Sequence, residues 1–137
     1  MAIHVRRTDY LKIPAFAVCG KSYYSAAMET IRARVHDPRF FIFSDDPGWC
    51  RRKFASADTV VVSESPPSPN PLRDMYLMSL ATHHIIANST YSWWAAWIAK
   101  SDIQQVMMPD RWLAGETIVP ISEKKLSHWT IIPTLPA

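Results

Sequence analysis

Two adjacent arginines near the amino end are the side chains best suited to bind phosphate. Arg6 and Arg7 stand in the segment HVRRTDY, shortly after His4. Side chains alternate along a strand, so His4 and Arg6 share one face and Arg7 lies on the other. A guanidinium at a strand end offers a permanently charged planar fork that can hold phosphate through two hydrogen bonds. Arg6 is therefore a candidate phosphate ligand, and Arg7 is expected to pair with Asp9 or another carboxylate; the alternative is that both are ordinary surface charges.

A polar turn, Asn88-Ser89-Thr90, is the second candidate anion site. It joins the apolar run Ile85–Ala87 to a helical pattern over Tyr91–Ile98. A turn between a strand end and a helix start presents free backbone N–H groups and the positive end of the helix dipole. We expect this turn to receive the diphosphate of a nucleotide-sugar. The chain has only three glycines and no glycine-rich phosphate motif, so arginine and a helix end would have to hold the phosphates.

Three carboxylates complete the set of candidate ligand-binding residues. Asp45 and Asp46 follow an apolar run and precede Pro47. Such a pair can hold Mg²⁺, but an acidic residue before a proline is more often a helix cap, which is the reading we favour. Asp74 falls in the first turn of a predicted helix, where the dipole stabilises a negative charge. Its functional reading is a carboxylate that accepts hydrogen bonds from the N1–H and N2–H₂ groups of guanine.

Composition describes one globular domain and argues against several classes of function. The 137 residues are 48% hydrophobic with a net charge of +3, a size typical of one domain. Basic residues are scattered and the tryptophans cluster in an apolar helix, where we expect them in the core, so nucleic-acid binding is not predicted.

No stretch is apolar enough to span a membrane, and no signal peptide is apparent. The two cysteines lack metal spacing, and His83 and His84 would point oppositely in a strand, so no metal site is predicted.

Short apolar runs alternate with helical patterns along the chain. We predict strands at Ala2–Arg7, Arg39–Phe43, Thr59–Val62, Ile85–Ala87, Gln105–Met108 and Thr130–Ile132, and helices at Tyr23–Val35, Pro47–Phe54, from Asn70-Pro71 onward and at Tyr91–Ile98. This pattern predicts an α/β fold, a Rossmann-like parallel sheet with helices on both faces. Such sheets bind ligands beyond the carboxyl ends of their strands, where the winding reverses. The arginines, the acidic pair and the polar turn each follow a strand, so we expect them to form one site.

Three motifs together resemble the family 11 glycosyltransferases, the α-1,2-fucosyltransferases. HVRRTDY is similar to the family's HxRRxD motif, FFIFSDDPGWC to its second motif and DMYLMSLATHHIIANSTYSWWAAWI to its third. The likeness runs from Ile3 to about Trp112, with departures at Ala81 and over residues 82–84. It implies a GT-B enzyme that needs no metal or other cofactor, of which residues 1–137 are the donor-binding, Rossmann-like domain. A first strand beginning at residue 2 fits this expectation, because the family's N-terminal, acceptor-side half would precede it.

The resemblance also implies an activity, the inverting transfer of L-fucose from GDP-fucose to a galactose hydroxyl of a glycan in α-1,2 linkage. Arg6 would grip the β-phosphate and Arg7 would support the fold of its motif. Ser89 and Thr90, in the same turn as Asn88, would lie by the diphosphate.

The guanosine would lie beside His4 and Asp74, with Asp45 and Asp46 near the base or ribose. No residue is indicated as the general base. Two alternatives to an enzyme stay open: a truncated, non-catalytic module that binds GDP or a GDP-sugar, and a structural relic without ligand affinity. The compartment would be the cytoplasm for a bacterial protein and the Golgi lumen, with a membrane-anchored parent, for a eukaryotic one.

Overall fold

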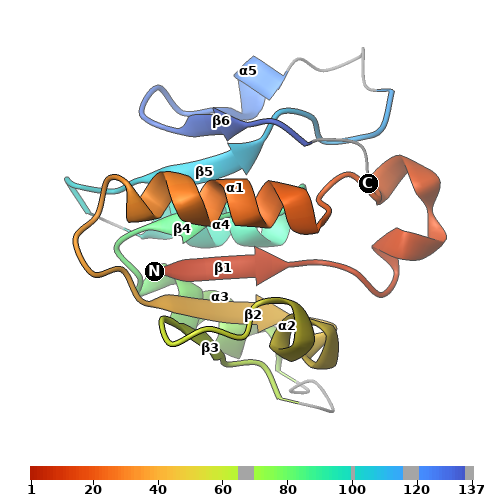
Figure 1. Ribbon diagram of the computed structural model, residues 1–137. Helices are drawn as coiled ribbons and strands as arrows, with labels where there is room; N and C mark the ends of the chain where they lie inside the picture. The colour runs from red at the N-terminus through yellow and green to blue at the C-terminus, as the bar shows by residue number, and fades with distance from the viewer. Residues whose placement is uncertain (65–69, 100, 116–120, 135–137) are drawn as a thin grey trace.

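Six parallel strands form one sheet in the order β3-β2-β1-β4-β5-β6 (Figure 1). The computed structural model describes residues 1–64, 70–99, 101–115 and 121–134. The strands are β1 Ala2–Val5, β2 Phe40–Ser44, β3 Thr59–Val61, β4 His84–Ile85, β5 Val106–Pro109 and β6 Thr130–Ile132. This is the strand order of a doubly wound Rossmann-like sheet, which confirms the predicted fold class.

Helices cover both faces of the sheet. They are α1 Lys21–Arg32, α2 Pro47–Lys53, α3 Pro71–Ser79, α4 Thr90–Ile98 and α5 Ile121–Lys124, with short 3₁₀ turns η1 Tyr10–Lys12 and η2 Pro14–Phe16. Figure 1 shows α1 and α2 on one face and α3 and α4 on the other. The four predicted helices are confirmed. Helix α1 begins at Lys21 with Gly20 as its N-cap, two residues before the predicted start at Tyr23.

Burial on both faces explains why the strands are continuous apolar runs. All four residues of β1 and of β5 are buried, and the β2 side chains Phe40 and Ile42 are inaccessible to solvent. Covering an isoleucine or phenylalanine side chain completely stabilises the fold by about 1.5–3 kcal/mol. The central strands are therefore rigidly packed, and the polar residues that follow them are positioned by this core.

The winding of the chain reverses between β1 and β4. Strand β1 pairs with β2 on one side and with β4 on the other, and the connections after β1 and β4 lead to opposite ends of the sheet. Connections that diverge in this way leave a crevice at the carboxyl ends of the two strands. The HVRRTDY segment and the turn Asn88-Ser89-Thr90 follow these two strands, so the fold brings them to the same crevice.

The tryptophans of α4 are less buried than the sequence suggested. The residues of α4 that face the sheet are small: Ser92, Ala95 and Ala96. Trp94 and Trp97 are 47% and 52% exposed, so the prediction that they are core residues is wrong. Small residues let the helix approach the sheet closely, and the bulky rings then project from its outer side.

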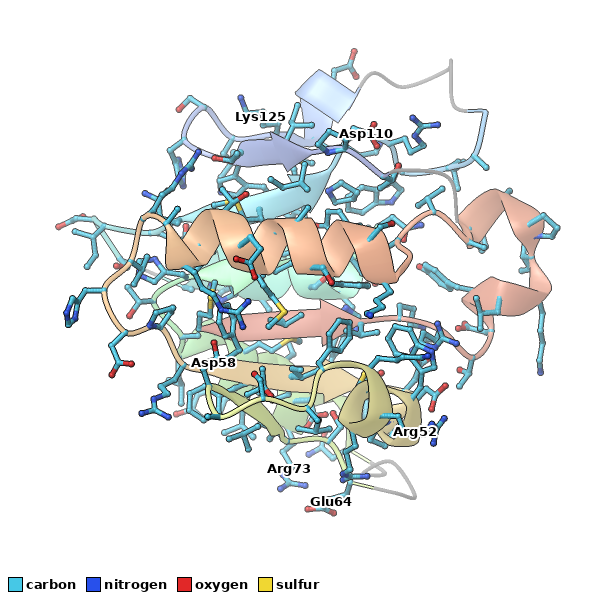
Figure 2. The ribbon with its side chains drawn as sticks, in the orientation of Figure 1. Arg52, Asp58, Glu64, Arg73, Asp110 and Lys125 are labelled. Carbon is cyan, nitrogen blue, oxygen red and sulfur yellow. The ribbon has the colours of Figure 1, made fainter. Side chains whose placement is uncertain are left out.

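Charged side chains lie around the periphery of the molecule. Figure 2 shows Arg52 on α2, Glu64 and Arg73 beyond the β3 edge, and Lys125 toward the β6 edge. The basic residues are thus as dispersed in space as they are in sequence. Within the described parts of the chain, no helix has the length and apolarity needed to cross a membrane.

Candidate functional site

A pocket of about 310 Å³ lies at the carboxyl end of the sheet, beside the starts of α3 and α4. Its wall contains five of the residues predicted from the sequence: His4, Arg6, Asp45, Asp74 and Ser89. The wall also contains residues that were not predicted as ligand-binding residues: Tyr10, Phe43, Ser44, Ser63, Asn70, Pro71 and Tyr91. The structure therefore brings most of the predicted set to one cavity.

Arg6 extends from the end of β1 into this pocket. Its Nη2 atom donates to Asp9 Oδ2 at 2.8 Å, and its Nε atom lies 3.5 Å from Asp45 Oδ2. The guanidinium also lies 5.5 Å from the centre of the Tyr10 ring. Of the two partners expected for Arg7, Asp9 pairs with Arg6 instead, and the expected other carboxylate is Asp46. The Arg6 side chain stays 36% exposed, which leaves it accessible to a ligand.

Arg7 points away from the pocket. It links the HVRRTDY motif to the FFIFSDDPGWC motif through Asp46 and Trp49. Its Nε atom lies 3.3 Å from Asp46 Oδ2, and its guanidinium stacks 3.8 Å from the centre of the Trp49 ring. Asp46 caps α2 by accepting from the Trp49 N–H at 3.0 Å, as predicted. That N–H, and then Arg7, hold the pKa of the Asp46 carboxyl below its usual value. Opposite orientations of Arg6 and Arg7 are therefore confirmed.

Asp45 fixes the loop that carries the arginines. Its carboxylate accepts from the backbone N–H of Arg7 at 2.8 Å and of Thr8 at 3.0 Å. The same carboxylate faces Arg6. Asp45 thus ties the end of β2 to the chain after β1 and sets the direction of the Arg6 side chain.

His4 is a buried, neutral imidazole at the floor of the pocket. Only 5% of the residue is exposed, and burial, with a further contribution from the charge of Arg6, lowers its pKa to about 4. Its ring lies 5.3 Å from the Tyr91 ring. Among the described residues, the buried Nδ1 atom of His4 has no hydrogen-bond partner. Buried polar atoms are rarely left unpaired, which makes this nitrogen unusual among the described residues.

Asp74 reaches the pocket from the first turn of α3. Its Oδ2 atom accepts a 2.9 Å hydrogen bond from the Ser63 hydroxyl, which in turn accepts from the Ser44 N–H at 2.9 Å. The Tyr91 hydroxyl donates to the Pro71 carbonyl, which links the starts of α3 and α4. The acidic side chain is therefore held by one hydrogen bond from Ser63, which is itself held by the end of β2.

The three residues of the predicted anion turn have different environments. The Asn88 amide donates to the carbonyls of Phe16 and Trp112 at 3.0 and 2.8 Å, so its side chain ties together two loops. Ser89 is the N-cap of α4, forms no side-chain capping bond and lines the pocket. Thr90 is the exposed first residue of α4. The uncapped start of α4 and the Arg6 side chain thus border the same cavity.

The structural histidine and the cysteines offer no further chemistry. His84 lies 2.9 Å through its Nε2 atom from the Met78 carbonyl, in keeping with the structural role predicted for it. Cys19 and Cys50 are free, and burial raises their pKa to about 12 and about 11, which disfavours a reactive thiolate. The described parts of the chain contain no group of three or more potential metal ligands.

The missed pocket residues were difficult to find from local patterns. Ser44 ends β2 and Ser63 comes shortly after β3, which was the available signal, but their partners lie 19 and 11 residues away in sequence. Tyr91 has the helical spacing of an ordinary core residue, and only the packing of α4 beside α3 places its hydroxyl at the pocket.

Comparison with known proteins agrees with this geometry. Residues 1–132 match the sequence model of Glycosyl transferase family 11. An alpha-1,2-colitosyltransferase of Escherichia coli is 33% identical over 126 residues, 86% of this chain and 42% of that protein. The O-antigen biosynthesis glycosyltransferase WbnK of Escherichia coli is 35% identical over 118 residues, 83% of this chain and 39% of WbnK.

A mammalian relative shows the same likeness. The galactoside 2-alpha-L-fucosyltransferase SEC1 of Bos taurus is 36% identical over 104 residues, 72% of this chain and 28% of that protein. The chain therefore spans less than half the length of these curated relatives. No solved structure gives a significant match.

Proposed function

The chain belongs to glycosyl transferase family 11, and on this premise we propose that its pocket binds GDP-fucose as the donor in the synthesis of an α-1,2-fucosyl linkage. The observation that carries the proposal is the position of Arg6 beside the start of α4 at one cavity. A guanidinium and unpaired helix N–H groups are complementary to the two negative charges of a diphosphate. Relatives named as a colitosyltransferase and a fucosyltransferase support a deoxysugar donor.

The opposite wall of the pocket suits the guanine base. Asp74 offers a carboxylate to the N1–H and N2–H₂ donors of guanine, and neutral His4 offers an unpaired ring nitrogen. Asp45 borders the space between these groups and Arg6. Base, ribose and diphosphate would therefore follow one another from α3 toward α4.

Transfer would proceed by inverting displacement at the anomeric carbon of fucose. A galactose hydroxyl oxygen of the acceptor glycan forms the new bond, while the bond from that carbon to the phosphate oxygen breaks and GDP leaves with its electron pair. The proton of the hydroxyl passes to a base outside the residues assigned here. Arg6 stabilises the charge that grows on the departing diphosphate, an interaction stronger in the transition state than with the substrate. Arg7 positions Arg6 through the loop that carries both residues. The proposed transfer requires no metal ion.

The acceptor would be bound by polypeptide outside this chain. The chain matches 42% and 39% of the length of its two bacterial relatives. We propose that a further domain carries the contacts to the galactose-terminated glycan and that turnover requires it. Partial coverage also favours the second candidate function, a non-catalytic module that binds GDP or GDP-fucose.

Titration calorimetry with GDP, GDP-fucose and UDP tests the donor assignment. We expect GDP and GDP-fucose to bind and UDP to bind at least tenfold more weakly. Arg6→Ala should lower the affinity for GDP by about 10- to 100-fold, since a charge-assisted phosphate contact contributes about 1.5–3 kcal/mol. Arg34→Ala is the matched control, because Arg34 is an exposed arginine that contacts Gln105 and Thr130 instead.

The outcomes separate the candidate functions. Indifference of the wild-type chain to GDP would rule out both donor-binding functions. With the further domain present, release of GDP from GDP-fucose in the presence of a galactoside would identify an enzyme, and binding without release would identify a binding module.

A further inference from the structure

A chain of three groups connects the sheet to the acidic wall of the pocket. The Ser44 N–H donates to Ser63 Oγ, and Ser63 Oγ donates to Asp74 Oδ2, each at 2.9 Å. Ser44 and Ser63 are only 6% and 4% exposed. All three residues line the pocket. The chain thus runs from the end of β2, through the segment after β3, to the first turn of α3.

The direction of these hydrogen bonds is fixed by the number of protons. A serine hydroxyl has one proton to donate. Because Ser63 Oγ already accepts the hydrogen of the Ser44 N–H, its own proton is directed to Asp74. A backbone N–H cannot reverse its role, so Asp74 Oδ2 is held as an acceptor in one orientation. Each carboxylate oxygen can accept two hydrogen bonds, so Oδ2 keeps one acceptor site beside Ser63 and Oδ1 keeps both for a ligand in the pocket.

We propose that Ser63 determines the base selectivity of the pocket by fixing the orientation of Asp74; this inference rests on the proposed binding of a GDP-sugar. A carboxylate held in one orientation accepts two parallel donors, and guanine presents such a pair at N1–H and N2–H₂. Adenine has an acceptor at N1, and uracil flanks its single N–H with two carbonyl oxygens that a carboxylate repels. Ser63 is a positioning residue, since it acts on the base through Asp74.

Comparison of GDP with IDP measures this role directly, because hypoxanthine differs from guanine only in lacking the N2 amino group. We expect wild-type protein to bind GDP at least tenfold more tightly than IDP, in the range of one well-placed hydrogen-bonded pair. Ser63→Ala should weaken GDP about tenfold and IDP less than twofold, so that the preference for GDP largely disappears. Ser63→Thr keeps the hydroxyl and should restore most of the preference.

Two further variants provide the controls. Ser79→Ala removes a hydroxyl from the far end of α3, where it donates to the Tyr76 carbonyl, and should leave both affinities unchanged. Asp74→Asn should also abolish the preference, and adding Ser63→Ala to it should cause no further loss, because both changes act on the same contact. Should Ser63→Ala fail to fold, Ser63→Cys keeps the shape with a weaker donor and should reduce the preference partially.

The result that would overturn the inference is an equal loss of GDP and IDP affinity in Ser63→Ala, which would indicate a structural role alone. Unchanged affinities for both GDP and IDP in Ser63→Ala would also overturn the inference. These results are distinct from failure of the proposed function, which would be seen in the wild-type protein as indifference to both nucleotides.

Discussion

Arg6 and Arg7 are neighbours in sequence but have different roles in the fold. Arg6 faces the pocket and keeps about a third of its side chain exposed, whereas Arg7 is half as exposed and stacks on Trp49. Asp46, whose carboxylate pairs with Arg7, caps α2. One arginine is therefore placed to bind a ligand and the other to hold β1 and α2 together.

We expect Arg7→Ala to destabilise the protein by about 1–2 kcal/mol, since it removes a cation–π contact and a partly buried ion pair. Arg7→Lys keeps the charge but loses the planar stacking on Trp49, and should give an intermediate loss. Denaturant unfolding monitored by tryptophan fluorescence measures both changes. Arg73→Ala is the control, because Arg73 forms an exposed pair with Glu64 (Figure 2) and should cost less than about 0.5 kcal/mol.

At the scale of elements, the Tyr23 hydroxyl links α1 to the half of the sheet that contains β4 and β5. Tyr23 is fully buried, and its OH donates to the Ile86 carbonyl at 2.6 Å, with the Met107 carbonyl at 3.3 Å. Ile86 directly follows β4, and Met107 lies within β5. The contact stabilises the strand ends from which the turn before α4 departs.

Tyr23→Phe should therefore lower the free energy of unfolding by about 1–2 kcal/mol, because the ring still fills its site while the Ile86 carbonyl loses a donor. Tyr76→Phe, at a tyrosine of α3 that is 65% exposed, should have no measurable effect. Thermal unfolding followed by circular dichroism compares the two variants. Equal stability of Tyr23→Phe and wild type would show that the hydroxyl contributes nothing to the sheet.

Most of the architecture could be predicted from the sequence because its causes are local. Short apolar runs between helical patterns identify buried parallel strands, and Asn70-Pro71 and Asp46-Pro47 identify two helix starts. Arg6 and Ser89 were expected to converge because each follows a strand, which is a local signal, and parallel strands end at the same edge of the sheet. These parts of the prediction depended on residues close together in sequence.

The remainder depended on contacts between distant segments. Nothing near Asn88 indicates that its amide binds carbonyls 72 and 24 residues away. Ser63 becomes a pocket residue only when β3 lies beside β2. The outward position of Trp94 likewise follows from how closely α4 packs on the sheet, which hydrophobicity does not reveal.

At the scale of the whole molecule, two buried histidines make folding sensitive to acid. Burial lowers the pKa of both His4 and His84 from 6.5 to about 4. In the unfolded chain each takes up a proton near pH 6.5, while in the folded protein each stays neutral until about pH 4. The unfolded state therefore binds more protons in this range, and stability falls as the pH drops.

We expect the free energy of unfolding to be greatest above about pH 6.5 and to fall between pH 6.5 and 4, by an amount on the order of 3 kcal/mol for each histidine. Denaturant unfolding at a series of pH values measures the slope. His84→Gln should reduce the slope, and His36→Gln, at an exposed histidine, should leave it unchanged. A stability that is flat across this range would contradict the neutral state assigned to the buried rings.

The carboxylates around Arg6 have a consequence for what can enter the pocket. The Arg6 guanidinium already faces Asp9 and Asp45, so its positive charge is partly neutralised. An incoming anion must compete with these two carboxylates for it. Chloride or free phosphate gains little from that exchange. The proposed nucleotide would recover this loss through contacts of its base with the opposite wall of the pocket. On the proposed function, the resting ion pairs would therefore favour a whole nucleotide over small anions.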